Sequence, residues 1–418
     1  MTVINAVYAW NVNLNNGNVN NNNRNNNNSV LSVSAFQPMY PITIESIYDA
    51  YFDTNRTTKD MVLFSLSLDC ELVKLWKEIQ AGTYELSRTK AFMVYSPKKR
   101  EIFAMAPRDK VVNHWVRLRI EPLLEMEFSP GCYSCRKGKG GTAFARDLLE
   151  KSNELTSRYG VCYYAHLDVR NFFMSINRNF ALSRIAGLVE REYRGDDKAT
   201  LLWLLGKIFL FAPEKNFIIC GDPHDWDGYP TEKSLRTNGS DDGLMMGSVN
   251  SQLVANYILT ETDRYIAGLG ISVFRYVDDL LLVHHDRDHL LRSIPLIEDF
   301  IFRDTGLTIH RNKRYFQPAF RGVMIIGYFV KGGRLYLSNR CVSNLHKRIH
   351  AYNALIREHP KSARKARHNF VACVNSYFGR SLNCRAYNIR SRYWEMIAPE
   401  WKRMVHGCTG LRKIRLNK

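Results

Sequence analysis

Three acidic residues in the sequence lie where carboxylates are unusual and chemically useful. Asp168 follows a short apolar run, and Asp278 and Asp279 separate two further apolar runs. Carboxylates beside buried apolar segments are costly, and neighbouring carboxylates repel one another unless a cation neutralises them. Hard oxygen ligands suit Mg²⁺, and two such ions about 4 Å apart support in-line phosphoryl transfer. The alternative is an ordinary turn pair at Asp278 and Asp279, because Asp is common in turns.

The segments around these acids have the pattern of buried strands. Val161–Leu167 leads into Asp168, while Ser272–Tyr276 and Leu280–His284 flank the acidic pair. A continuous apolar run bounded by turn residues predicts a buried strand, and two runs this close together predict a hairpin. A strand end and a hairpin tip can supply carboxylates from neighbouring strands to the same ions.

The remaining chain mixes strands and helices. Strands are predicted at Ala91–Tyr95, Glu101–Met105, Val323–Val330 and Arg334–Leu337. Apolar residues at helical spacing predict helices over residues 42–82, 108–126, 180–193, 199–209, 250–267 and 290–302, and three more beyond residue 338. Residues 213–242 are rich in Gly, Pro and Asp, which predicts a long loop or insertion.

Composition narrows the class of protein. The chain has 418 residues, 45% of them hydrophobic, and a net charge of +19. From residue 338 onward there are 18 lysines and arginines against three acids, which favours contact with a polyanion such as nucleic acid. A solvated basic tail is the alternative. No apolar run is long enough for a membrane span, and nine scattered cysteines favour a reducing, cytoplasmic location.

An ordered set of motifs between residues 96 and 330 resembles the reverse transcriptases. Tyr276-Val277-Asp278-Asp279 is similar to their signature hairpin, and Asp168-Val169-Arg170-Asn171-Phe172-Phe173 to their first acidic motif. The other matching segments are Gly243–Gln252, Gly306-Leu307-Thr308 with Lys313, and Ile326-Gly327-Tyr328. The resemblance implies an α+β right-hand polymerase with fingers, a palm of antiparallel sheet plus helices, and a helical thumb.

The resemblance also implies a domain order. Residues 39–160 would hold N-terminal helices and fingers, and residues 161–337 a palm with an insertion around 213–242. Residues 338–418 would form a basic helical thumb. Residues 1–38 are an Asn-rich leader, with 13 Asn among the 18 residues from Asn11 to Asn28, for which we expect disorder.

One subfamily is closer than the others. Most reverse transcriptases have Gln before the motif's Gly247 and Pro after its Ser251, whereas this chain has Met246 and Gln252. A Ser-Gln ending is similar to the reverse transcriptases of diversity-generating retroelements, as are Tyr133–Gly140 and Asp225–Gly228. That family more commonly has Pro-Ile where this chain has Met245 and Met246. The departure affects the expected shape of the base-pair pocket, not the expected reaction.

Metal-binding roles follow from the resemblance. Asp168 and Asp278 are expected to bind two Mg²⁺ ions, with Mn²⁺ as a substitute. Asp279 is expected nearby and less essential, and the carbonyl of Val169 is a further expected ligand.

Substrate roles are carried over in the same way. Arg100 matches the arginine that grips the incoming triphosphate, and Phe173 matches the bulky residue that excludes a ribose 2′-hydroxyl, with a core phenylalanine as the alternative. Lys313 matches a lysine that donates a proton to pyrophosphate, with a plain surface charge as the alternative. Gly247 is expected to let the backbone approach the primer–template, and Met246 and Gln252 to loosen the grip on the templating base.

The implied function is RNA-directed DNA synthesis that copies a template-repeat RNA into cDNA with errors at adenines, for targeted protein diversification by mutagenic retrohoming. The expected partners are template RNA, cDNA, deoxynucleoside triphosphates and a small basic helical accessory variability protein, with no membrane. The Asn-rich leader is interpreted as a translated template repeat or, alternatively, a low-complexity leader. The alternative functions are a retron-type or phage-defence reverse transcriptase, and a non-catalytic RNA-binding relative.

Overall fold

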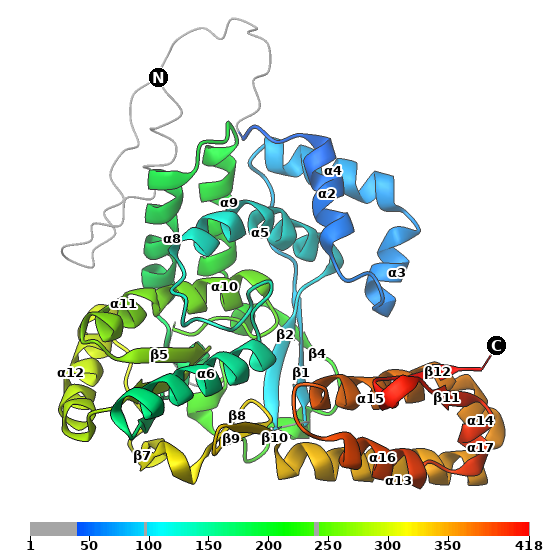
Figure 1. Ribbon diagram of the computed structural model, residues 1–418. Coiled ribbons are helices and arrows are strands. Elements are labelled where there is room, and N and C mark those ends of the chain that lie inside the picture. Colours follow the sequence, from blue (N-terminus) through cyan, green and yellow to red (C-terminus); the bar gives the residue numbers. More distant parts are fainter. Residues whose placement is uncertain (1–39, 96–97, 238–241, 418) are drawn as a thin grey trace, which may run out of the picture. The chain divides into compact units, whose positions relative to one another are not determined.

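The computed structural model describes residues 40–95, 98–237 and 242–417. The chain divides into two compact units, each assembled from separate segments. The segments can be followed by residue number through the colours of Figure 1. The described residues of the first unit fall within 1–128, 170–260 and 304–307, and those of the second within 129–169, 261–303 and 308–418. The predicted leader at residues 1–38 lies outside the described residues, and the predicted domain boundaries remain predictions.

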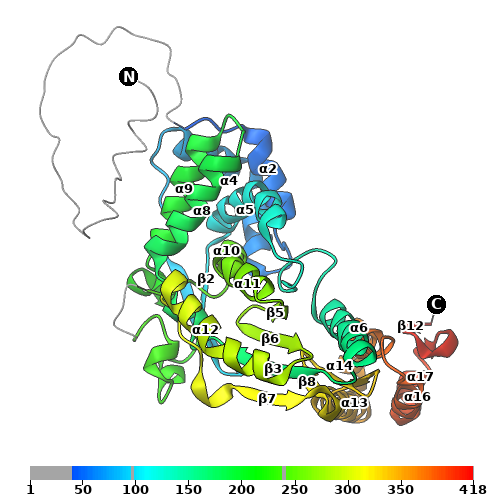
Figure 2. The ribbon, with the colours of Figure 1, turned by 60° about the vertical axis from the view of Figure 1, so that its left-hand side comes forward.

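The first unit is mainly helical. Its helices are α2 (Ile44–Asp53), α3 (Lys59–Ser65), α4 (Leu68–Gln80), α5 (Pro107–Glu127), α7 (Phe172–Ser175), α8 (Arg178–Glu192), α9 (Lys198–Leu210) and α10 (Val249–Ile258). Helix α4 buries Leu72, Leu75 and Ile79 on one face, which agrees with the helical spacing of apolar residues predicted over residues 42–82. Helices α8 and α9 run side by side (Figure 2).

A small sheet in this unit has the strand order β2-β1-β4. Strands β1 (Thr89–Val94) and β2 (Arg100–Ala104), both predicted as strands, pair antiparallel. Strand β1 also pairs parallel with β4 (Phe217–Ile219). Strand β4 was not predicted, because its three residues lie within the Gly- and Pro-rich stretch from 213 to 242. The stretch is therefore not a plain loop.

The same stretch is fastened to β2 by a buried carboxylate. Glu101 is 1% exposed, and its two oxygens accept hydrogen bonds from the Trp226 indole, the Ser234 hydroxyl and the Leu235 amide, each at 2.7 Å. A buried carboxylate is stable only when its lone pairs are satisfied, and these donors satisfy both oxygens.

The single helix predicted over residues 250–267 is two helices, α10 and α11 (Thr260–Gly268). Leu259 ends α10 with φ −90° and ψ 7°, outside the regular helical range. Apolar spacing continues across this break, so the pattern alone did not show it.

The central feature of the second unit is a four-stranded antiparallel sheet with the order β5-β6-β3-β7 (Figure 2). Its strands are β3 (Tyr163–Asp168), β5 (Ser272–Tyr276), β6 (Asp279–His284) and β7 (Tyr315–Pro318). The predicted hairpin of β5 and β6 is confirmed. Directly paired residues point to the same face of a sheet, so Asp168, His166 and Asp279 share one face.

That face packs on helix α6 (Gly141–Tyr159) and on a three-stranded sheet. Phe144 and Leu148 of α6 share a buried core with Tyr164, Phe274 and Leu281 of the large sheet. The smaller sheet comprises β8 (Val323–Ile325), β9 (Tyr328–Lys331) and β10 (Arg334–Leu337). The strand predicted over Val323–Val330 is divided because Ile326 and Gly327 both have positive φ and make a turn.

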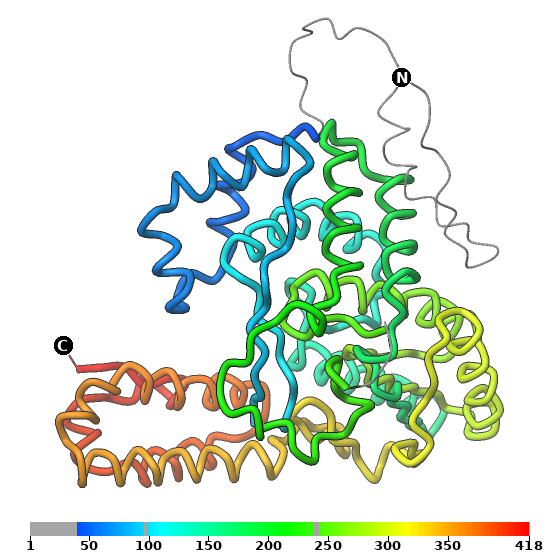
Figure 3. The backbone as a smooth tube through the Cα atoms, turned by 180° about the vertical axis from the view of Figure 1, so that it is seen from behind, coloured from blue at the N-terminus to red at the C-terminus, as the bar shows by residue number. Residues whose placement is uncertain are grey.

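Helix α12 (Arg287–Thr305) follows the hairpin, and the chain beyond residue 338 runs out along α13 and then turns back (Figure 3). This part holds α13 (Asn339–Glu358), α14 (Pro360–Lys365), α15 (Arg367–Ser381), α16 (Tyr387–Met396) and α17 (Pro399–Lys402), with the paired strands β11 (Val405–Gly407) and β12 (Ile414–Leu416). The prediction of three helical segments was therefore too coarse.

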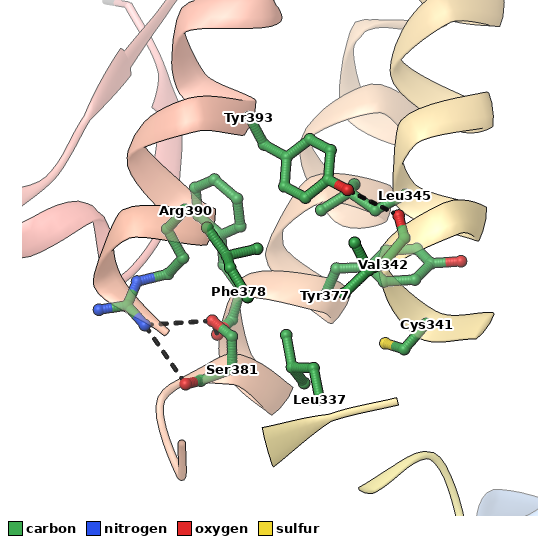
Figure 4. Close-up of a pocket in the computed structure, with 10 residues that line it drawn as sticks. Leu337, Cys341, Val342, Leu345, Tyr377, Phe378, Ser381, Arg390 and Tyr393 are labelled. Carbon is green, nitrogen blue, oxygen red and sulfur yellow. Dashed lines mark hydrogen bonds between the residues drawn. The ribbon is translucent and has the colours of Figure 1, made fainter. Parts of the chain in front are cut away.

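The C-terminal helices have their own core. Phe370 stacks on Trp401 with ring centroids 4.2 Å apart. The Tyr393 hydroxyl donates to the Val342 carbonyl at 2.8 Å, and Arg390 donates to Ser381, so α16 is tied to α13 and α15 (Figure 4). In the described ranges, no helix combines the length and apolar character needed to cross a bilayer.

Candidate active site

Strand pairing brings the three predicted acids to one end of the four-stranded sheet. Asp168 ends β3 and is paired in register with Asp279, the first residue of β6. The amide of Val169 donates to the Asp278 carbonyl at 3.1 Å, which joins the strand end to the hairpin tip. Asp168 and the Asp278-Asp279 pair, which are far apart in the sequence, thus meet at one end of the sheet.

The hairpin turn has an unusual backbone. Val277 has φ +60°, a left-handed conformation in which β-branched residues are rarely found. Positive φ at the first of two central turn residues is typical of a type II′ turn, where glycine is preferred. The turn therefore holds a valine in a conformation that the sequence does not favour locally.

The carboxylates affect one another. Burial, followed by the neighbouring carboxylates of Asp279 and Asp168, raises the pKa of Asp278 to about 6, while Lys313 acts in the opposite direction. A buried carboxylate beside two others is destabilised when charged. A bound cation would remove this repulsion.

Lys313 lies against the first of these acids. It belongs to the short 3₁₀ turn Arg311–Lys313 that precedes β7, and its ammonium nitrogen is 2.8 and 3.0 Å from the two oxygens of Asp168. The amide of His310 donates to the Asp168 carbonyl at 2.7 Å, which fixes the turn beside the strand end. The structure thus places predicted Lys313 in the acidic cluster, although its side chain is 52% exposed.

Two neighbours of the cluster were missed by the sequence reasoning. The Nε2 atom of His166 is 3.2 Å from Oδ1 of Asp279, and its ring stacks on Tyr315, with centroids 5.0 Å apart. His166 is two residues before Asp168, so strand alternation would have placed it on the same face.

The carboxylates at this end of the sheet have the chemistry of a cation-binding site. Among the described residues, no group of three His, Cys, Asp or Glu side chains is already arranged to hold a metal ion. Burial and the neighbouring carboxylates nevertheless make the charged form of Asp278 unfavourable, and the Lys313 ammonium already lies against Asp168. Asp168, Asp278 and the Val169 carbonyl would hold the metal, with Asp279 close by.

The other predicted site residues belong to the first unit. Arg100 is exposed at the start of β2, and Phe173 is half-buried in α7 beside the fully packed Phe172. Met246 is half-buried and Gly247 exposed, just before α10, and Gln252 is exposed on that helix. The partial exposure of Phe173 differs from the burial of a core phenylalanine.

The segment around Gly247 is fixed by a buried polar network. The Ser248 hydroxyl donates to the Asn113 side-chain oxygen at 2.8 Å, and the Asn250 amide donates to the Asn113 carbonyl at 2.9 Å. Gly247 has φ +114°, and a Cβ atom there would lie 3.2 Å from the Phe103 carbonyl oxygen. Glycine is needed here for the backbone conformation and for the approach to β2.

An antiparallel sheet that presents acids at a strand end and at an adjacent hairpin tip, together with a mainly helical C-terminal segment, defines an α+β protein of the right-hand polymerase class, as predicted. The chain belongs to the reverse transcriptase (RNA-dependent DNA polymerase) family, whose model matches residues 95–328, more than half of its length. No curated protein matches the chain.

Solved telomerase structures are distantly similar. Apo telomerase from Candida tropicalis without its C-terminal domain is 10% identical, with 60% of this chain and 55% of that chain covered and a TM-score of 0.43. The fuller apo structure from the same organism is 11% identical, with 76% and 62% covered and a TM-score of 0.44. Candida albicans telomerase with a fragment of telomeric RNA is 9% identical, with 77% and 61% covered and a TM-score of 0.41. The chain thus spans less than two thirds of these proteins.

Proposed function

We propose that this chain is an RNA-directed DNA polymerase that adds deoxynucleotides to a primer 3′-hydroxyl. The observation that carries the proposal is the convergence of Asp168, Asp278 and Asp279 at one end of the two inner strands of the sheet. The family membership supports the same reaction class. A non-catalytic RNA-binding protein would have no need to hold three mutually repelling acids together.

We assign metal binding and proton donation to different residues of the cluster. Asp168, Asp278 and the Val169 carbonyl would bind two Mg²⁺ ions, or Mn²⁺ in their place, and Asp279 adds negative charge beside them. Two bound ions would activate the attacking hydroxyl and neutralise charge on the triphosphate. The Lys313 ammonium donates a proton to the departing pyrophosphate, and its exposure lets it leave Asp168 for that role.

A primer-extension assay on an RNA template tests the proposal. Asp278→Asn should abolish extension, whereas the matched variant Asp288→Asn, at an exposed surface pair with Arg287, should retain it. Full activity of Asp278→Asn, or an inactive wild-type protein, would contradict the proposal.

Nucleotide selection is assigned to Phe173, whose partly exposed ring would meet a 2′-hydroxyl, and triphosphate binding to the exposed Arg100. Phe173→Ala should increase incorporation of ribonucleotides relative to deoxynucleotides, because it removes the steric block. Phe172→Leu, at the packed neighbour, serves as the control. An unchanged ratio in Phe173→Ala would reassign Phe173 to the core.

We further propose the diversity-generating subclass, with a template-repeat RNA copied with errors at adenines. The support is the Ser251-Gln252 ending and Met246, with Gln252 exposed on α10. Replacing Gln252 with Pro and sequencing the cDNA tests this, because unchanged adenine errors would refute the role of Gln252. A wild-type cDNA without excess adenine errors would favour a retron-type or phage-defence enzyme.

The proposed partners follow from this function. They are the template RNA and its cDNA, deoxynucleoside triphosphates, and a small basic helical accessory protein, all met in the cytoplasm. The basic segment beyond residue 338 is proposed as the thumb that grips the duplex backbone, because cationic side chains neutralise phosphates without reading sequence.

A further inference from the structure

The turn that carries Asp278 and Asp279 is supported from outside the hairpin. The Val277 amide donates to the Ser134 hydroxyl oxygen at 2.9 Å, and Ser134 is 1% exposed. The Val277 carbonyl accepts from a guanidinium nitrogen of Arg275 at 3.4 Å. Both backbone groups of the strained residue are therefore held by side chains.

Arg275 is itself held by a buried ion pair. Its guanidinium donates to both carboxylate oxygens of Asp263 in α11, at 2.8 to 3.1 Å, and both side chains are 0% exposed. A bidentate ion pair of this kind fixes the orientation of the guanidinium as well as its position. Its remaining nitrogen is thus aimed at the turn.

Ser134 is positioned by backbone pairing along β5. The Arg275 amide donates to the Gly131 carbonyl at 2.7 Å, and the Tyr133 amide donates to the Arg275 carbonyl at 2.9 Å. A Cβ atom on Gly131 would lie 2.2 Å from the Val273 carbonyl oxygen, so only glycine permits this approach. Residues 131–134 therefore act as a short additional edge beside the hairpin strand.

We propose that Ser134, Arg275 and Asp263 are positioning residues that hold Val277 in its left-handed conformation and so fix the direction of the Asp278 and Asp279 carboxylates. This inference rests on the proposed function, since it assigns these residues a part in presenting the metal-binding acids. Left-handed backbone in a β-branched residue persists only where its surroundings enforce it. The three residues provide that enforcement from three separate segments, namely residues 131–134, β5 and α11.

The test uses Ser134→Ala, which removes the acceptor of the Val277 amide and leaves both side chains of the buried ion pair in the sequence. Ser152→Ala is the matched control, because Ser152 is also buried in the same unit and its hydroxyl bonds to Leu148 and Tyr164, not to the turn. Two quantities are measured on folded protein: the Mg²⁺ concentration that gives half of the Mg²⁺-dependent thermal shift, and kcat against KM for deoxynucleotides.

Ser134→Ala should raise the Mg²⁺ midpoint and lower kcat by about threefold to tenfold each, as expected for loss of one buried hydrogen bond, with KM unchanged. Ser152→Ala should move neither quantity. A Ser134→Ala protein that behaves like this control overturns the inference, even if the wild type is an active polymerase. A shifted Mg²⁺ midpoint with an inactive wild type would instead support the inference and reject the proposed function, and a wild type without any Mg²⁺-dependent shift overturns both.

A second substitution separates the strained turn from general packing. Val277→Gly supplies a residue that adopts positive φ without strain, so the turn no longer depends on its support. The effect of Ser134→Ala on the Mg²⁺ midpoint should therefore shrink to less than about twofold in the Val277→Gly background. An equal effect in both backgrounds would show that Ser134 does not act through Val277.

Discussion

The ammonium nitrogen of Lys313 lies 2.8 and 3.0 Å from the two carboxylate oxygens of Asp168. A divalent cation that binds Asp168 must compete with this ammonium for the same oxygens. The lysine that we assign to proton donation is therefore also a competitor of the metal in the protein without substrate.

Replacing Lys313 with Ala should tighten Mg²⁺ binding while slowing extension. An ion pair this exposed contributes little free energy. The Mg²⁺ midpoint of the thermal shift should therefore fall by only about threefold. Loss of the general acid should lower kcat by about 100-fold. Lys331→Ala, at an exposed lysine of β9, should change neither. An unmoved midpoint would mean that Lys313 and the metal do not share Asp168.

Asp278→Asn should stabilise the metal-free protein while removing activity. The pKa of Asp278 is raised from 3.8 to about 6 on folding, so its charge destabilises the folded state at pH values above 6 by about 2–3 kcal/mol. Urea unfolding without metal should show the gain at pH 8 and a smaller gain at pH 5, where the folded carboxyl is already protonated. Equal gains at both pH values would contradict the assignment.

His166→Phe should lower extension without unfolding the protein. Phenylalanine keeps a ring beside Tyr315 but cannot bond to Asp279, and one hydrogen bond of this kind is worth about a fivefold effect. His285→Phe is the control, since His285 stacks on Tyr159 in the same unit. Equal activity of the two variants would exclude a role for His166 in orienting Asp279.

Gly247→Ala should lower the free energy of unfolding by about 1–3 kcal/mol. The new Cβ would lie close to the Phe103 carbonyl oxygen, and alanine is strained at the positive φ of this position. Gly187→Ala in α8, where an added Cβ meets no atom within 4 Å, should instead be neutral or stabilising by up to about 1 kcal/mol. Chemical unfolding of both variants measures the difference. A neutral Gly247→Ala would show that this segment can shift to accept a side chain.

The sequence predicted the elements that carry the chemistry because their patterns are local. The apolar runs before Asp168 and around Asp278 defined β3, β5 and β6 to within a residue or two. Lys313 was named from a motif, but its contact with Asp168 depends on a tertiary approach that no local pattern encodes.

Other features were missed for identifiable physical reasons. Strand β4 is too short for an alternation pattern, and Leu259 ends a helix while the apolar spacing continues. The support of Val277 by Ser134 joins two distant segments of the chain, and neither residue is unusual in its own sequence context. Such long-range polar contacts appear only in the folded structure.

The bonding of Glu101 has a consequence for nucleotide handling. Glu101 holds Trp226, Ser234 and Leu235 of the 213–242 stretch and directly follows Arg100, the proposed triphosphate ligand. Shortening or repacking that stretch would therefore disturb the strand that presents the arginine. A change in this insertion would thus alter the affinity for the incoming nucleotide without any substitution of Arg100.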